Sequence, residues 1–205
     1  MKDRRASSAQ FDLSYLKAGV EQLEDYLLSQ EIYQAIGISA SIGEMPYPQL
    51  TLGNLLLAAK RVQATLYDRS EHIEWNHLSQ KLVDSRSRWQ VAWRKKASAE
   101  YRQRLNLWGQ FLEEYDKEPE ANYDRYGYEV RRRVILEILS DETENTNETE
   151  QEKLSNLDRF LESVFVAGDF IWDSKLLSSF PRSPYWYLYG HIKNRFLRGE
   201  NPVML

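Results

Sequence analysis

Residues 77–115 read HLSQKLVDSRSRWQVAWRKKASAEYRQRLNLWGQFLEEY and decide the fold. This stretch has no proline and a single glycine, Gly109, so it contains little that would interrupt a helix. Its apolar and aromatic residues recur at steps of three, four or seven and share one helical face: Leu78, Leu82, Trp89, Trp93, Ala97, Tyr101, Leu105, Trp108, Leu112 and Tyr115. Such a helix is about 55 to 60 Å long, too long for one partner helix to cover. The sequence therefore predicts an all-α, elongated bundle built on one long central helix.

About five helices are expected in all. Asp68 and Glu71 have the spacing of a capping box, so the central helix is expected over 70–115. Apolar periodicity predicts other helices over 8–29, over 52–67 with Thr51 as the N-cap, over 128–140 and over 154–167. Whether the helix after Thr51 continues into the central helix stays open.

Two segments differ from the helical pattern. Residues 141–152 contain six acids and no base, which predicts a flexible surface loop. The last segment, 169–205, is rich in aromatic residues. We expect it to pack on the bundle as a short helix or an irregular segment, because a single strand would have no partner.

Composition indicates one cytoplasmic domain over residues 1–205. The chain is 42% hydrophobic and 28% charged, has no cysteine, and contains no run of about 18 apolar residues that could span a membrane. Residues 1–10 lack the apolar core of a secretory signal. We expect no cofactor and no membrane contact.

A basic stretch, 81–104, interrupts an acidic protein. It has eight Lys or Arg against two acids, whereas the whole chain has a net charge of −4. Five of the cations could contact nucleic acid, with Trp89, Trp93 and Tyr101 interleaved to stack bases: Arg86, Arg88, Arg94, Lys95 and Arg102. Alternatively, the aromatic residues form the buried stripe and the cations coat the outer side.

Charged residues also fall where the buried stripe should continue. Lys96, Glu100 and Arg104 are four apart along one face, flanked by Trp93 and Trp108. We predict a partly buried polar hub in which Glu100 pairs with both cations. The alternative is a solvated row of charges.

Two weaker candidates remain. Glu74 and His77 form Glu-x-x-His, which resembles half of the ferritin-like di-iron motif, but neither His72 nor His191 completes a second copy. The aromatic tail could dock a partner or close the end of the bundle, through Trp172, Tyr185, Trp186, Tyr187 and Tyr189.

The sequence indicates a non-enzymatic helical interaction or scaffolding protein with a protein partner or self-association. One alternative is a nucleic-acid-binding accessory protein that uses residues 81–104. A second is a metal- or cofactor-dependent helical-bundle enzyme.

Overall fold

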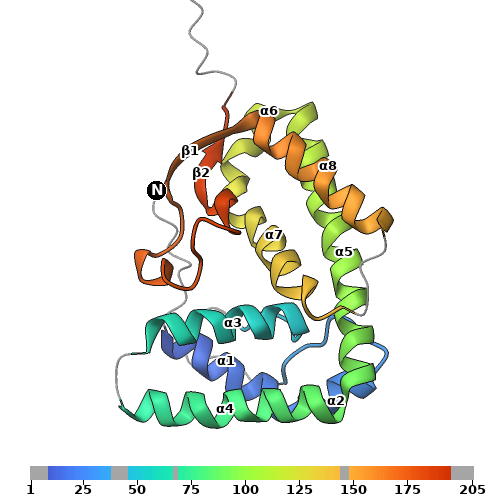
Figure 1. The fold of residues 1–205 in the computed structure, drawn as a ribbon, viewed down its shortest axis with the longest axis vertical. Coiled ribbons are helices and arrows are strands. Elements are labelled where there is room, and N and C mark those ends of the chain that lie inside the picture. Colours follow the sequence, from blue (N-terminus) through green and yellow to red (C-terminus); the bar gives the residue numbers. More distant parts are fainter. Residues whose placement is uncertain (1–8, 38–45, 67–68, 144–147, 195–205) are drawn as a thin grey trace, which may run out of the picture.

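The computed structural model describes residues 9–37, 46–66, 69–143 and 148–194. In these ranges the fold is all-α with one small sheet (Figure 1). Its elements are α1 (Ala9–Glu21), α2 (Leu23–Leu28), α3 (Leu52–Thr65), α4 (Arg69–Arg88), α5 (Gln90–Lys117), α6 (Pro119–Asn122), α7 (Tyr126–Ser140), α8 (Glu148–Val164), β1 (Phe165–Phe170) and β2 (Tyr189–Ile192), with 3-10 turns at Tyr123–Arg125, Ser174–Leu176 and Trp186–Leu188. None of the described helices is both long and apolar enough to cross a membrane.

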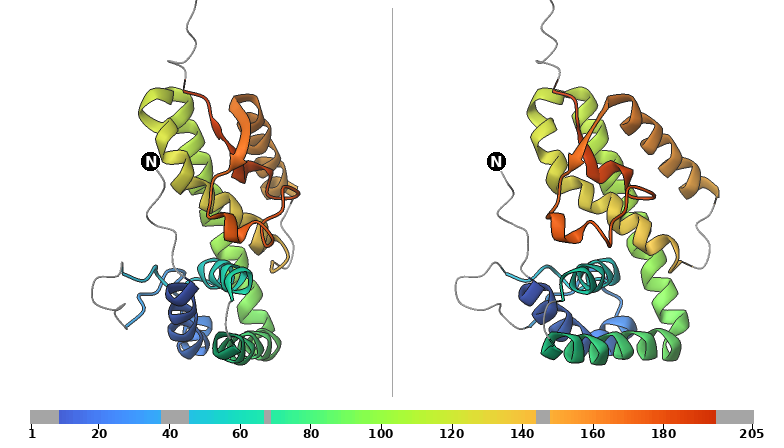
Figure 2. Two further views of the ribbon diagram at one scale, coloured as in Figure 1. Left: turned by 90° about the vertical axis from the view of Figure 1, so that its left-hand side faces the viewer. Right: turned by 60° about the vertical axis from the view of Figure 1, so that its left-hand side comes forward.

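The central helix expected over 70–115 is two helices, α4 and α5, that meet at a sharp corner (Figures 1 and 2). Trp89 leaves the helical region (φ −111°, ψ 34°), although its carbonyl still accepts from the Trp93 N–H at 2.8 Å. The prediction of one helix was therefore wrong. Because no proline or glycine lies at the bend, we attribute it to packing: α4, with Leu78 and Leu82 buried, packs on α1 and α3, whereas α5 packs on α7.

The N-terminal helices form a lower layer in which α1, α3 and α4 pack together (Figure 1). The Thr51 side chain caps α3 by accepting from the Asn54 N–H at 3.0 Å, as expected. Leu66 is extended (φ −69°, ψ 127°), so α3 and α4 are separate helices. The first expected helix is also divided, at Gln22.

The upper layer contains α5 and α7, with α8 lying along the outside of α5 (Figure 1). Helix α8 begins at Glu148, inside the segment expected to be a loop, and residues 144–147 of that segment lie outside the described residues. Glu148 and Glu150 occupy the first turn of α8, where carboxylates favour a helix. Only Leu161 of α8 is fully buried.

The C-terminal segment differs from the helix or irregular segment that we expected. β1 follows α8 directly and pairs with β2 in antiparallel register, with Phe165 opposite Ile192 and Ala167 opposite Gly190. Gly190 has φ +150°, and a Cβ there would lie 2.1 Å from the Val166 carbonyl oxygen. The strand β2 therefore finds its partner in β1, most of which lies in residues 165–167 that were expected to be helical and in Gly168, which the sequence pattern did not indicate.

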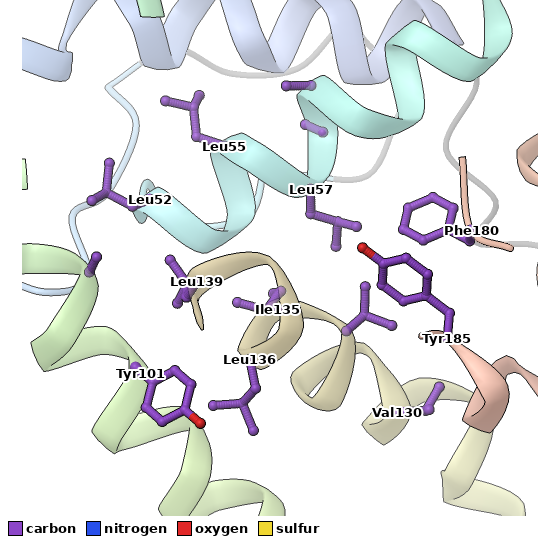
Figure 3. Close-up of a cluster of buried hydrophobic side chains, with 14 of the residues drawn as sticks. Leu52, Leu55, Leu57, Tyr101, Val130, Ile135, Leu136, Leu139, Phe180 and Tyr185 are labelled. Atoms are coloured by element: carbon purple, nitrogen blue, oxygen red, sulfur yellow. The ribbon is translucent and has the colours of Figure 1, made fainter. Parts of the chain in front are cut away.

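One hydrophobic core connects the layers. Figure 3 shows Leu57 of α3 beside the rings of Phe180 and Tyr185 from the C-terminal segment, with Ile135 of α7 in the same buried cluster. Leu57, Ile135 and Phe180 are at most 1% exposed. The aromatic segment therefore closes the seam between α3 and α7.

Candidate functional site

Glu100 lies at the centre of the molecule with no exposed surface. Its Oε2 accepts from the backbone N–H of Gly53 at 2.8 Å, and its Oε1 accepts from Nε of Arg104 at 2.8 Å. Gly53 is in the first turn of α3, where unpaired N–H groups and the helix dipole favour negative charge. A carboxylate on α5 thus completes the N-terminus of α3.

This contact depends on the absence of a side chain at residue 53. A Cβ on Gly53 would lie 2.2 Å from Cγ2 of Ile135 and 2.7 Å from Oε1 of Glu100. Glycine is therefore required by the close approach of α5 and α7 to α3, and not by an unusual φ angle.

Two arginines extend the network to α7. Arg104 donates through Nη2 to Thr51 Oγ1 at 3.3 Å and to Asn54 Oδ1 at 3.2 Å, and Arg131 donates to the same Asn54 oxygen at 2.9 Å. Burial, together with the positive charges of Arg104 and Arg61, lowers the pKa of Arg131 to about 10. We call this group the Glu100 cluster: Thr51, Asn54, Glu100, Arg104 and Arg131.

Lys96 is buried but does not join the cluster. Its Nζ donates to Ser29 Oγ at 3.1 Å and to the carbonyl oxygen of Glu31, and it lies 4.4 Å from the centre of the Tyr26 ring. The expected pair with Glu100 is therefore wrong, because the Lys96 ammonium is directed toward the chain that follows α2. Burial lowers the pKa of Lys96.

The chemistry of the Glu100 cluster is that of a structural connection. Both oxygens of Glu100 accept hydrogen bonds from groups of the chain itself. The neighbouring Tyr15 and Tyr26 donate their hydroxyls to backbone carbonyls, and burial raises the pKa of both. The cluster joins α3, α5 and α7 through polar contacts across the core.

Two of the five candidate cations in the basic stretch form ion pairs with acids on other elements. Arg86 forms an ion pair with Glu142 at 2.9 Å, and Arg102 forms one with Glu150 at 3.1 Å. The aromatic residues offered for base stacking are withdrawn from solvent: Trp93 is 1% exposed, Tyr101 is 2% exposed, and Trp89 is half-buried. These placements agree with the alternative in which the aromatic residues form the buried apolar stripe of the helix.

The other three candidate cations lie around the bend between α4 and α5. Arg88, Arg94 and Lys95 are exposed there, and Val91 between them is 76% exposed. We call Arg88, Val91, Arg94 and Lys95 the basic elbow. Figure 1 shows that the bend between α4 and α5, around which these residues lie, forms an outer corner of the fold close to α2.

A shallow groove lies between α5 and α8, near the opposite end of α5. It has a volume of about 400 Å³ and apolar walls from Leu112, Leu157 and Phe160. Glu113 and Asp116 lie on its α5 side. We call this feature the α5–α8 groove, and no sequence pattern pointed to it.

The aromatic residues proposed for docking are largely used inside the fold. Tyr185 and Tyr187 are 6% and 0% exposed, which agrees with the alternative in which the aromatic tail closes the end of the bundle. The half-buried members contact other aromatic rings of the segment or the core: Trp172, Trp186 and Tyr189. Closure of the bundle accounts for this arrangement.

Among the described residues, no further ligand joins Glu74 and His77, the weak candidate for a metal site. Glu74 lies 3.6 Å from Nζ of Lys17. Within the four described ranges, no three His, Asp or Glu side chains form a group that could hold a metal ion.

Sequence reasoning also missed a second buried arginine. Arg133 donates from Nε and Nη2 to the two oxygens of Asp158, both at 2.9 Å, and from Nη1 to Glu137 at 2.9 Å. The bidentate pair raises the pKa of Arg133 despite its burial. Only the Glu137 contact, at i,i+4, has a signal in the sequence, because Asp158 lies on α8.

Together, the fold and the Glu100 cluster define an all-α protein with a buried polar connection at its centre. Comparison with protein-family models finds no match, and neither do comparisons with curated proteins and with solved structures. Function is therefore inferred from the exposed surfaces.

Proposed function

We propose that this chain is a non-enzymatic interaction protein that binds an acidic protein segment through the basic elbow. The observation that carries the proposal is the elbow itself, where Val91 is 76% exposed among the outward cations Arg88, Arg94 and Lys95. An exposed apolar side chain ringed by cations suits a partner that offers carboxylates around an apolar contact.

Other exposed apolar side chains lie on the elements that converge at the elbow. Leu28 of α2 is 54% exposed and Val83 of α4 is 55% exposed. Single exposed apolar residues are ordinary on protein surfaces, but three large ones on adjoining helices favour an interface at this corner.

Nucleic-acid binding is the competing function. Glu142 and Glu150 already neutralise two of the five candidate cations, and the buried Trp93 and Tyr101 cannot stack on bases. The net charge of −4 also opposes a polyanion. These observations favour a protein partner.

The test compares two polyanionic probes. Labelled polyglutamate peptide and labelled polythymidine oligonucleotide are titrated by fluorescence anisotropy against the wild-type protein. The variant Arg88→Ala/Lys95→Ala removes two elbow cations, and the matched control Arg69→Ala/Arg159→Ala removes two exposed cations elsewhere. Because each exposed ion pair contributes up to about 1 kcal/mol, the elbow variant should bind the peptide about tenfold more weakly.

Peptide binding that weakens in the elbow variant and not in the control supports the proposal. Equal peptide affinities for the two variants would overturn it, as would no peptide binding at low ionic strength. Preferential binding of the oligonucleotide, reduced in the elbow variant, would replace it with the nucleic-acid function.

A further inference from the structure

We infer that Glu142 and Glu150 are built-in competitors of the acidic partner: they occupy Arg86 and Arg102 in the free protein, and the partner displaces them when it binds. This inference rests on the proposed function of the basic elbow and adds a regulation of that site. We call Glu142 and Glu150 the internal acids.

The first internal acid, Glu142, lies just after α7 and contacts both sides of the bend between α4 and α5. Its Oε2 lies 2.9 Å from Nε of Arg86 on α4, and it accepts from Nε1 of Trp93 on α5 at 2.9 Å. Two donors therefore converge on one carboxylate oxygen. The same donors suit the carboxylate of a glutamate or aspartate from another chain.

The second internal acid, Glu150, contacts a face of α5 that continues from the elbow. Spacings of four, seven and four residues place four side chains along this face: Val91, Lys95, Arg102 and Asn106. Figure 1 shows that α8 begins beside the middle of α5. There Glu150 pairs with Arg102 at 3.1 Å, and Lys153 donates to the Asn106 side chain at 2.7 Å. The first turns of α8 thus show how an acidic segment lies on this face, whereas Val91 and Lys95 stay exposed.

The cations of both internal pairs remain accessible to a partner. The Arg86 and Arg102 side chains are 53% and 62% exposed, whereas those of Glu142 and Glu150 are 12% and 16% exposed. A carboxylate of the partner can therefore approach each arginine before the internal acid leaves. Exchange of one carboxylate for another costs the fold little, because ion pairs with an exposed member contribute little to stability.

The internal acids have the advantage of belonging to the same chain. The fold holds Glu142 and Glu150 beside their arginines, so they lose no translational freedom on pairing, whereas a separate segment does. A partner with one or two carboxylates gains little from Arg86 and Arg102 and depends on the elbow alone. A partner with several adjacent carboxylates can pair with the elbow and with both arginines. The internal acids therefore favour such a segment over isolated charges.

The experiment titrates labelled polyglutamate peptide by fluorescence anisotropy against wild type and three variants. The internal-acid variant, Glu142→Gln/Glu150→Gln, removes both competing charges and keeps an oxygen acceptor at each residue. The combined variant carries the same two changes together with Arg86→Ala/Arg102→Ala. It has no arginine for the internal acids or the peptide to contest.

The matched control is Glu148→Gln/Glu152→Gln, which makes the same change in net charge on exposed residues of α8 beside Glu150. The internal-acid variant should bind the peptide about fivefold more tightly than wild type, because two exposed arginines become available to the peptide. The control should change the affinity by less than about twofold, because its charges are more strongly screened from the peptide. The combined variant should lose the gain and bind as wild type does.

A second measurement uses the unmutated protein. The indole N–H resonance of Trp93, assigned by NMR in isotopically labelled wild type, should shift as the peptide is added. The reason is that a peptide carboxylate takes the place of Glu142 at Nε1 of Trp93. This readout does not depend on the folding of any variant.

Three results would each overturn the competition: an equal gain in the control, a gain that persists in the combined variant, or a Trp93 resonance that does not move at saturating peptide. A gain confined to polythymidine oligonucleotide, titrated in parallel, would assign the two arginines to nucleic acid instead. If wild type binds the peptide through the elbow and the internal-acid variant binds no more tightly, the proposed function stands and only this inference is wrong. If neither protein binds the peptide at low ionic strength, both are wrong.

Discussion

Replacing Glu100 by alanine should be among the most damaging single changes to the stability of this protein. The substitution removes the carboxylate that accepts from Arg104 and from the Gly53 N–H, both at 2.8 Å. Arg104 is 7% exposed, so water cannot readily replace the lost partner. The variant would leave a buried guanidinium and a buried amide poorly paired.

The expected loss in the free energy of unfolding follows from the burial of Glu100 and Arg104. Removing one partner of a buried ion pair costs about 3 to 5 kcal/mol, most of it from the uncompensated charge left behind. The buried Gly53 amide of α3, left without an acceptor, adds to this cost, although the two contributions overlap because they share one carboxylate. With a urea m-value of about 2.5 kcal/mol/M, the unfolding midpoint should fall by about 1 to 2 M.

Urea unfolding followed by circular dichroism measures this change. Glu113→Ala is the matched control, because Glu113 and Lys117 form an i,i+4 pair at 2.7 Å with both side chains about two-thirds exposed. This control should leave the midpoint unchanged. A double variant, Glu100→Ala/Arg104→Ala, should lose less stability than the sum of its single changes, because it no longer buries an unpaired charge.

An unchanged midpoint in Glu100→Ala would refute the reasoning. It would mean that water or a relaxed Arg104 replaces the carboxylate without cost, and that the Glu100 cluster does not hold α3 on α5. Strict additivity in the double variant would separately refute the coupling between Glu100 and Arg104.

Further predictions concern glycines and tyrosines. Gly53→Ala should destabilise the fold by about 1 to 3 kcal/mol in the same urea assay, because its Cβ would lie 2.2 Å from Ile135. Gly109→Ala should raise stability by up to about 1 kcal/mol, since its Cβ meets only ordinary contacts; a lower midpoint would contradict this. Burial raises the pKa of Tyr185 to about 12 and also raises the pKa of Tyr26, relative to 10.0. The folded state therefore retains protons that the unfolded state releases. The contribution of these tyrosines to the free energy of unfolding is complete below pH about 10 and is lost as the pH rises above it. The absorbance contributed by the buried tyrosines should appear together with unfolding, and an absorbance that reaches its full unfolded-state value before helix is lost would count against buried hydroxyls.

Helix positions were predictable where local chemistry determines them. The Thr51 cap places the start of α3, and the spacing of Val130, Val134 and Leu139 places α7, because each signal lies within a few turns of chain. Long-range packing produced the errors. The bend at Trp89 has normal hydrogen bonds before and after it, and it allows α4 and α5 to pack on different layers.

The two strands show the same limit. Their aromatic residues fit a strand or a helix equally well. The choice between the two secondary structures therefore depended on whether a partner strand existed. β1 supplies that partner from residues that continued the apolar pattern of α8. The α5–α8 groove was equally hidden, because it is formed by residues about 45 positions apart that no periodicity connects.

Charge pairs at i,i+4 show most clearly what spacing alone leaves undetermined. Glu100–Arg104 and Glu113–Lys117 have the same spacing, and the two ion pairs are 2.8 and 2.7 Å long. Their environments differ, because the Glu100 side chain has no exposed surface and that of Glu113 is 67% exposed. The discriminating signal is the interruption of an apolar stripe: Glu100 lies where an apolar residue is expected, whereas Glu113 lies off that face. A charge at a core position needs partners from other helices, as Gly53 supplies here, whereas a charge off the stripe, such as Glu113, can be stabilised by water and a neighbour on its own helix.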